Sequence, residues 1–575
     1  MIKGCLESFK EMYDEKGEKL ITDSYVLGEG SYVLVDEHGE IVEILEVDKK
    51  NSDKTGRYYE FAEMDYLSKL VSMDKPVDQK KVIHSNNFLS FFVKKENISN
   101  GKLTDDIIEN YYKNLSDPRI KYKDKEKKRM YELLEEKYGK SDIDSIEKQK
   151  AWIKSNIFSI LNKLKNNKSY LKVFLKANIE EYKKESEKYV VPNIYNNTQF
   201  NVKTEKSTYG LPNDNMGLNQ KKPYLDNKTR KNSTPYLVSL EEVILQKKFF
   251  DYLYNNVCES KTNIYISDGY IKCLSNDENL DDKFSGYFLR VKKGKEVEIH
   301  DFDIIVGLDN KLKGLFIDTI ILIDYTKFKG LLSDNYGEIK DISTLKMLIS
   351  DIYFNKFLTN NYFSDPKDIK LNDFRVKENL IKSRGAFFNW FYKGDTIVIK
   401  QIFDKTSMEL IKNAICNEYM IKAKEQFNLR CGILDYLIGG EKMADILNGL
   451  ASSLREKINN KQTDKIESDN EYYFAVGQIS SYLLSKSKSS KKVHSLINPL
   501  LNCKTDEKLK LQLQMLFKKY NYDIQKESKR FNNFSAMVLG YQTESKVDDN
   551  MLVAGYLYSS LIYESKKEGE VKDGE

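Results

Sequence analysis

The chain has 575 residues, of which 93 are Lys or Arg and 88 are Asp or Glu, giving a formal net charge of +5. Its length and its 40% content of hydrophobic residues are enough for two to four domains with cores of their own. The small net charge excludes a uniformly polybasic protein but allows local basic surfaces. The most apolar segment, residues 315–323, is too short for a membrane span and contains Asp318. Because residues 1–10 also lack an apolar signal core, we expect a cytoplasmic protein with no membrane partner.

The six cysteines are scattered, no C-x-x-C pair occurs, and only four histidines are present. Structural zinc needs closely spaced pairs of such ligands, so we expect reduced thiols, no metal site and no cofactor. Only ten of the 93 basic residues are Arg, a bias typical of an AT-rich bacterial genome. Lysine is a point charge that suits backbone phosphate, but codon bias and solubility are an alternative explanation of its excess.

The N-terminal part of the chain predicts mixed structure. Residues 32–35 and 41–47 flank His38-Gly39, a pattern that predicts a β-hairpin. The apolar and aromatic segment 82–93 predicts a strand. Residues 103–179 are rich in Lys and Glu at helical spacing, which predicts a solvated helical insertion.

The central part begins with residues 189–235, which are rich in Asn, Gly, Pro and Lys and predict a long loop, ordered or partly mobile. Helical spacing returns at residues 237–257. The elements predicted after it are hairpins over 264–273, 287–299 and 302–323, mainly helices to Gly385, a strand over 396–402, and then helices again.

Beyond Gly439-Gly440 the pattern is entirely helical. Apolar residues repeat at helical spacing in three stripes, which we interpret as core packing: Leu447, Leu450, Leu454 and Ile458; Tyr472, Val476, Ile479 and Leu483; Leu509, Leu513 and Leu516. The predicted fold class is α+β, with mixed N-terminal and central regions containing β-hairpins and an all-α C-terminal bundle. The predicted boundaries are 1–200, 201–440, 441–565 and a disordered tail at 566–575.

The search for catalytic motifs finds little. Gly28-Glu29-Gly30 is a lone G-x-G, better interpreted as a hairpin turn than as a phosphate loop, and no G-x-S-x-G motif occurs. His300-Asp301 resembles the dipeptide of metal-dependent phosphohydrolases, but its surroundings alternate with the period of a strand. No spacing singles out a set of carboxylates, although composition does not exclude a two-metal site. We therefore predict no catalytic residue.

A basic segment lies within the predicted central loop. Its cations are Lys221, Lys222, Lys228, Arg230 and Lys231. Short polar side chains interleave with them, including Asn227, Thr229, Asn232, Ser233 and Thr234. Cations beside small polar groups are what phosphate contacts need, and Asn is also able to recognise a base edge. A solvated linker is the alternative interpretation.

A second basic cluster lies in the terminal helices. Between Lys486 and Arg530 there are twelve basic residues against four acidic ones, a net charge of +8. The acidic residues are Asp506, Glu507, Asp523 and Glu527. A bundle with one cationic face attracts a polyanion, and each phosphate that it neutralises adds roughly 0.7 to 0.9 to the salt slope of binding. Ordinary solvated helix faces are the alternative.

Three blocks of sequence resemble a known family. The first block is KPVD at residues 75–78 followed by IHSNNFLSFFVK at 83–94, and the second is KKPYLDNKTRK at 221–231 followed by PYL at 235–237. The third consists of FAVGQI at 474–479, YLLS at 482–485, RFNNF at 530–534, LGY at 539–541 and AGYL at 554–557. In order and spacing these blocks resemble the large subunit of subtype I-B CRISPR effector complexes (Cascade).

The resemblance implies a role in RNA-guided antiviral defence. A subunit of this family helps to recognise the short motif beside the DNA target, stabilises the R-loop and recruits a separate helicase–nuclease, without catalysis of its own. Guide-RNA pairing supplies sequence specificity. The implied partners are guide RNA, target DNA, the backbone and small subunits, and the helicase–nuclease. The C-terminal bundle is expected to resemble the small subunit and to line the path of the displaced strand.

Site residues follow from these clusters. For contacts to the adjacent motif we predict Asn86, Asn87, Lys228, Arg230, Lys231 and Asn232. Residues 85–87 are equally compatible with a turn. For contacts to the displaced strand we predict Lys486, Lys488, Lys491, Lys492, Lys518, Lys519, Lys529 and Arg530. Asn532 and Asn533 are alternatively residues that cap or pack the bundle.

Members of the family also make a separate small subunit by internal translation. Gly439-Gly440-Glu441-Lys442-Met443 must be encoded as GGN-GGN-GAR-AAR-AUG, which in an AT-rich genome predicts a purine-rich ribosome-binding site just before a start codon. We predict a second product that starts at Met443, with an ordinary Gly-Gly helix break as the alternative.

Two rival functions stay open on the sequence alone. One is a metal-dependent nuclease that uses His300, Asp301 and nearby carboxylates. The other is a protein-only adaptor whose lysines serve solubility.

Overall fold

The structure is a computed structural model that describes most of the chain. The described residues are 2–48, 54–165, 167–204, 207–213, 237–294, 296–324, 336–439, 442–460, 464–488, 493–524 and 528–563. Close contacts divide the chain into two compact units, one of residues 1–275 with 286–304 and one of residues 276–285 with 305–575. This division does not coincide with the sequence-based boundaries at residues 200 and 440.

The first unit is built on a four-stranded sheet with the order β2-β1-β4-β3. Its strands are β1 (Gly30–Val35), β2 (Ile41–Val47), β3 (Ser90–Lys94) and β4 (Tyr170–Leu175). β1 and β2 are antiparallel, which confirms the predicted hairpin. Of the predicted strand over 82–93 only the end is regular, because β3 begins at Ser90.

β4 is the strand that the sequence prediction missed. It pairs in parallel with β1 and antiparallel with β3, so it lies inside the sheet although it belongs to the segment predicted as a helical insertion. Leu171, Val173 and Phe174 are buried on it. A Cβ on Gly30 would lie 2.8 Å from the carbonyl oxygen of Tyr170, so glycine permits the close approach at the start of this pairing.

The first unit also contains the following helices. They are α1 (Ile2–Lys16), α2 (Lys19–Thr22), α3 (Tyr58–Ser68), α4 (Lys95–Ser99), α5 (Asp105–Ser116), α6 (Pro118–Lys121), α7 (Lys125–Tyr138), α8 (Ile143–Leu161), α9 (Ile179–Asn193) and α11 (Leu240–Cys258). The prediction of a solvated insertion is wrong for α5 and α8. Ile108, Tyr111, Ile153 and Ile157 are fully buried, because each helix turns one apolar face to the core and keeps its Lys and Glu outside.

A second sheet has the order β11-β10-β8-β9. Its strands are β8 (Asn263–Ser267), β9 (Tyr270–Leu274), β10 (Phe284–Lys293) and β11 (Val297–Leu308), which confirms the first two predicted central hairpins. The third is wrong, because β11 continues to Leu308 and the short β12 (Phe316–Ile317) pairs with β13 (Gly337–Glu338). Three short strands, β5 (Val202–Lys203), β6 (Thr208–Gly210) and β7 (Val238–Ser239), form a further sheet.

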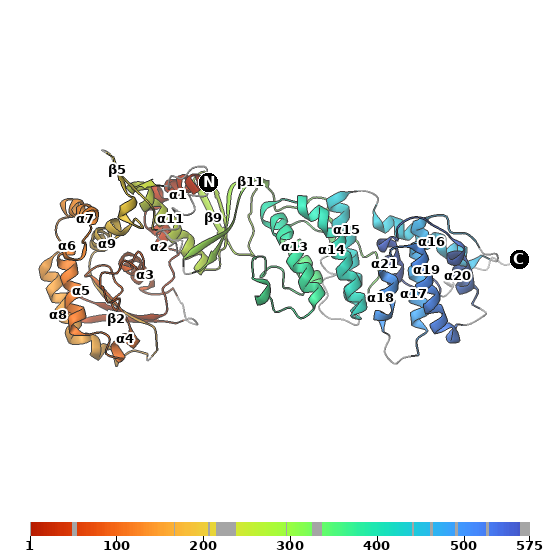
Figure 1. Cartoon of the computed structure of the whole chain (residues 1–575), viewed down its shortest axis with the longest axis horizontal. Coiled ribbons are helices and arrows are strands. Elements are labelled where there is room, and N and C mark those ends of the chain that lie inside the picture. Colours follow the sequence, from red (N-terminus) through yellow and green to blue (C-terminus); the bar gives the residue numbers. More distant parts are fainter. Residues whose placement is uncertain are drawn as a thin grey trace. The chain divides into compact units, whose positions relative to one another are not determined.

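The second unit is mainly helical (Figure 1). Its first long helices are α12 (Ile342–Phe354), α13 (Phe374–Lys393), α14 (Ile397–Cys416) and α15 (Met420–Ile438). The predicted strand over 396–402 is wrong, because these residues open α14. Ile399 and Phe403 lie one helical turn apart and are both buried, so the apolar run covers one face of a helix.

As predicted, every regular element among the described residues after Gly439 is a helix. The α-helices are α16 (Met443–Asn459), α17 (Asp469–Ser485), α18 (Asn498–Leu501), α19 (Asp506–Tyr520), α20 (Lys529–Gly540) and α21 (Asp549–Leu557). The predicted stripes are buried apart from Leu450, which is partly buried. The same core contains Ile411 and Ala414 of α14 and Phe427 of α15. Residue 440 therefore separates two groups of helices but not two cores.

α17 and α21 cross at two glycines. A Cβ on Gly555 would lie 2.0 Å from the carbonyl oxygen of Phe474, and a Cβ on Gly477 would lie 2.3 Å from that of Leu552. Only glycine lets the two backbones come this close. Next to the crossing, the buried Gln478 side chain donates to the carbonyl of Gly555 and accepts the backbone N–H of Leu561.

A buried arginine joins three helices of the second unit. Arg430 of α15 is 2% exposed and donates to the carboxylate of Asp404 and the hydroxyl of Ser407 on α14. It also donates to the side-chain oxygen of Asn550 on α21, at 2.6 Å from Nη2. Because its donors meet a carboxylate and neutral oxygens, this cation is buried with its hydrogen bonds made.

We predict that Gly555→Ala destabilises the second unit by about 2–3 kcal/mol, since the added methyl group must push two backbones apart. Gly449→Ala is the matched control, because a Cβ at that position of α16 meets nothing within 4 Å. The control is expected to be neutral or stabilising by up to about 1 kcal/mol through helix propensity. Urea unfolding followed by circular dichroism measures both changes, and equal stabilities of the two variants would contradict the close crossing.

Candidate nucleic-acid interface

Asn86 and Asn87 do not lie on a surface. They are 2% and 1% exposed, and the amide of Asn86 donates to the carbonyls of Leu67 and Lys69. The amide of Asn87 donates to Ser68, and its oxygen accepts from Ser90. We therefore correct their predicted role. These side chains tie the end of α3 to the start of β3, and their hydrogen-bonding groups face the protein.

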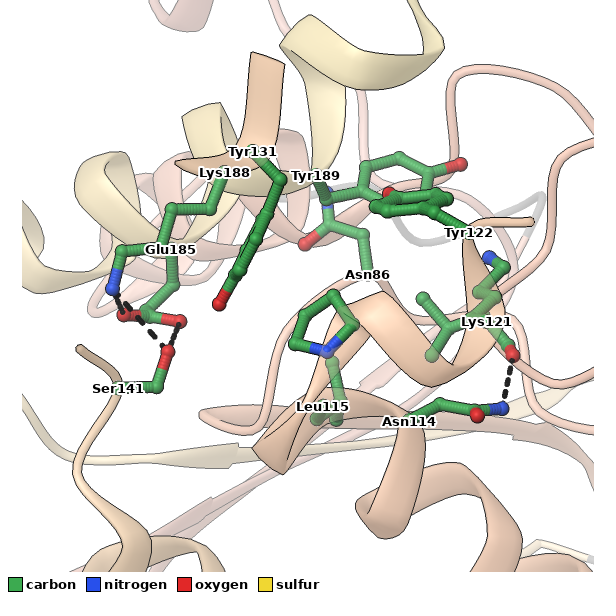
Figure 2. A pocket seen from close by; sticks show the side chains of 12 residues that line it. Asn86, Asn114, Leu115, Lys121, Tyr122, Tyr131, Ser141, Glu185, Lys188 and Tyr189 are labelled. Carbon is green, nitrogen blue, oxygen red and sulfur yellow. Dashed lines mark hydrogen bonds and ion pairs between the residues drawn. The ribbon is translucent and has the colours of Figure 1, made fainter. Parts of the chain in front are cut away.

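Asn86 nevertheless borders a pocket in the first unit (Figure 2). Lys121 lies at one side of this pocket, and Lys188 pairs with Glu185 at 2.7 Å at the other. The rings of Tyr122 and Tyr189 line the space between them. The pocket is thus a tyrosine-lined hollow with an amine at its edge.

Lys121 belongs to a group of three half-buried lysines. Its ammonium donates to the carbonyl of Pro76, that of Lys75 to the carbonyls of Asn193 and Tyr195, and that of Lys127 to the side-chain oxygen of Asn193. Within the described part of the chain none of the three forms an ion pair with a carboxylate. Burial and then the nearby charge of Lys127 lower the pKa of Lys75 and of Lys121 to about 7.

Several lysines of the predicted basic cluster are exposed on the terminal helices and beside them. Exposed lysines are Lys488 after α17, Lys504 and Lys508 around the start of α19, Lys518 and Lys519 at its end, and Lys529 at the start of α20. Lys508, Leu511, Met515 and Lys519 follow helical spacing, so they share the solvent-facing side of α19. Leu511 and Met515 are 55% and 56% exposed, which makes this side both cationic and apolar.

Aromatic rings accompany several of these lysines. The Lys486 ammonium lies 4.8 Å from the ring centroid of Tyr482 and 5.2 Å from that of Tyr563. Lys488 lies 5.0 Å from the ring of Tyr522 and forms an ion pair with Asp523 at 3.6 Å. Cations alternating with rings are typical of surfaces that bind single-stranded nucleic acid.

Other predicted residues serve the bundle itself. The Arg530 guanidinium donates to Asn459 at 2.8 Å. Asn533 donates to the carbonyls of Ile458 and Asn460 and so caps the end of α16, which confirms the alternative interpretation for this residue. Lys510 is bound to Asp506 at 3.0 Å. These groups have partners within the fold, so we give them less weight in an interface.

Several predictions lie outside the described residues. They concern Lys228, Arg230, Lys231 and Asn232 of the basic central segment, Lys491 and Lys492 after α17, and the tail at 566–575. Met443 is described, and α16 begins at it.

His300 and Asp301 lie on β11, which confirms the predicted strand. His300 Nε2 is 3.4 Å from the carboxylate of Glu298. Among the described residues no three His, Cys, Asp or Glu side chains come together as ligands for a metal ion. In the same part of the chain, no helix has the length and apolar character that crossing a membrane requires.

The sequence analysis missed the exposed apolar residues of α19 and the rings beside the lysines. The exposed apolar residues of α19 could have been found from the spacing of Leu511, Met515 and Lys519. These residues lie on the side of the helix opposite the buried stripe, where apolar side chains indicate a surface for a partner. Comparisons of the chain with protein-family models, curated proteins and solved structures gave no match.

We predict that the region around α6 and α9 becomes more stable as the pH rises from 6.5 to 9. The pKa of Lys75 and of Lys121 is about 7 in the fold and about 10.4 in an unfolded chain, so over this range the unfolded state binds more protons. Hydrogen–deuterium exchange, corrected for its intrinsic pH dependence, measures the effect. A Lys75→Met/Lys121→Met variant should show a flatter dependence and Lys102→Met, at an exposed position, an unchanged one. Equal slopes in all three proteins would contradict the prediction.

Proposed function

We propose that this protein binds nucleic acid through its C-terminal helices, as the non-catalytic large subunit of a type I-B CRISPR effector complex in the cytoplasm. The observation that carries the proposal is the set of exposed lysines on α19 and α20. Lys518, Lys519 and Lys529 are exposed there, and within the described residues they form no ion pair with an acidic side chain. Such ammonium groups release counterions from a polyanion when they meet its phosphates.

The chemistry of this surface favours binding of single strands over sequence-specific recognition of a duplex. Lysines supply point charges, and the rings next to them supply stacking surfaces that accept any base. Within an effector complex the strand that fits is the DNA strand displaced when guide RNA pairs with the target. The lysine surface would hold this strand and so stabilise the R-loop.

Other parts of the proposal rest on the sequence resemblance. They are recognition of the motif beside the target, for which Lys228, Arg230, Lys231 and Asn232 are the candidates, and recruitment of a helicase–nuclease. The backbone and small subunits of the complex, guide RNA and target DNA are the proposed partners. With the amides of Asn86 and Asn87 occupied inside the first unit, recognition of the motif would depend on the basic central segment.

We predict that Lys518→Glu/Lys519→Glu weakens binding of single-stranded DNA roughly tenfold at low salt. If each lysine neutralises one phosphate, the salt slope of the binding constant falls by about 1.4. Fluorescence anisotropy with a labelled oligonucleotide at several salt concentrations measures both quantities. Lys80→Glu/Lys102→Glu is the matched control, because it makes the same change of charge at two exposed lysines of the first unit.

Three results would contradict this proposal. Equal losses in the lysine variant and its control would mean that net charge, not this surface, governs binding. DNA cleavage in Mg²⁺ or Mn²⁺ that is lost in His300→Ala would favour a nuclease. Failure to bind oligonucleotides in dilute buffer, even with the companion subunits supplied, would favour a protein-only adaptor.

We also propose that Met443 starts a second, shorter product. A C-terminally tagged gene should then give two bands, and silent recoding of the Gly439 and Gly440 codons should weaken the shorter band without changing the longer one. Silent recoding of the Gly385 codon is the control. A single band that recoding leaves unchanged would contradict internal initiation.

A further inference from the structure

A hollow opens between α17, α19 and α20 in the second unit. It encloses about 800 Å³ of empty space, open to solvent, and apolar side chains form most of its wall. Its lining residues include Phe517, Phe531, Leu539 and Lys518. The proposed contacts between the lysines and the phosphates of a nucleic acid do not require such a hollow.

The aromatic wall of the hollow is the end of a row of rings. Phe517 and Phe531 are stacked with centroids 6.1 Å apart and planes inclined by 6°. Phe531 stacks in turn on Tyr482 at 4.8 Å, and Tyr482 contacts Tyr563 at 5.1 Å. Phe531 and Tyr482 are buried, whereas Phe517 is 41% exposed. The row is therefore rigid inside and leaves Phe517 accessible at the hollow.

One polar group in the wall lacks a partner. Ser535 is a lining residue of the hollow, and its hydroxyl oxygen is buried without a hydrogen-bond partner among the described residues. A buried hydroxyl of this kind is costly, so an occupant with a donor or acceptor at its edge would be favoured over a purely aliphatic one. Gln514 supplies a second polar side chain in the same wall.

Charge at the edge of the hollow indicates how the occupant continues. Lys518 is exposed and, within the described ranges, forms no ion pair, and the next residue is the exposed Lys519. An occupant that is flat, has polar edges and is joined to an anionic chain matches the ring, the hydroxyl and the ammonium together. A nucleobase in a single strand has all three properties, whereas a paired base in a duplex has its face covered.

We infer that the hollow between α17, α19 and α20 takes a nucleobase of single-stranded nucleic acid, stacked on Phe517 with its edge at Ser535 and its phosphate at Lys518. This inference rests on the proposed function and adds to it a contact to bases. Because every base has a stacking face, the site would tolerate any sequence.

The test compares two oligonucleotides of about 12 residues on the full-length protein, oligo(dT) and the same sugar–phosphate chain without bases. The wild type should bind oligo(dT) roughly tenfold more tightly than the abasic strand. Phe517→Ala should remove this difference and leave the abasic affinity unchanged. Phe517→Tyr, which keeps the ring, should restore the preference.

Phe374→Ala is the matched control. It removes an exposed phenylalanine at the start of α13, in the same unit but outside the hollow, so the preference for oligo(dT) should persist. A second measurement needs no variant: 2-aminopurine within a bound oligo(dT) should lose fluorescence when it stacks on the ring.

Equal binding of the two oligonucleotides by the wild type would overturn the base site but leave the lysine surface intact. Unchanged 2-aminopurine fluorescence on binding would also overturn the base site, and would favour a protein side chain as the occupant of the hollow. Binding of neither oligonucleotide would overturn the proposed function itself.

Discussion

The close crossing of α17 and α21 is the constraint on which the second unit depends. At Gly477 and Gly555 two backbones approach to a distance that no side chain allows. The crossing places Gln478 where its amide joins the end of α21 and the residues that follow. α17 then lies against α19 and α20, so the orientation of the exposed lysines follows from a contact between two glycines.

The crossing also explains in physical terms two sequence segments that were first noted for their resemblance to a known family. The segments FAVGQI and AGYL contain these two glycines and the glutamine between the helices. Small residues at such positions are required wherever helices pack this closely. The resemblance itself is a matter of sequence order, whereas the glycine contact is a property of the fold.

Much of the fold was predictable from local periodicity. The stripe of Leu509, Leu513 and Leu516 predicted α19 correctly, and the hairpin predicted over 264–273 is formed by β8 and β9. The strand predicted over 396–402 failed because β-branched residues at the start of α14 are equally compatible with a helix when tertiary packing covers one face. β4 was missed because its pairing with β1 joins residues far apart in the chain, which no local pattern reveals.

The candidate site divides in the same way. The basic cluster that contains the lysines of α19 and α20 was predictable, because charges are counted directly from the sequence. Burial cannot be counted in this way. Asn86 and Asn87 were assigned to DNA because the sequence does not show that the amide of Asn86 meets the backbone of α3 and the amide of Asn87 the hydroxyl of Ser68. The stack of Phe517 on Phe531 was invisible for a related reason, since it requires two helices to be packed first.

The core that α14 and α15 share with the terminal helices has a consequence for a polypeptide beginning at Met443. Such a polypeptide would keep the glycine crossing and the lysines but lose Ile411, Ala414 and Phe427, which cover its apolar side, and Asn550 would lose Arg430. Without a partner, this polypeptide would expose apolar surface to water and tend to aggregate. The amount of this polypeptide that persists in the cell would therefore depend on the amount of a partner protein that covers the apolar surface.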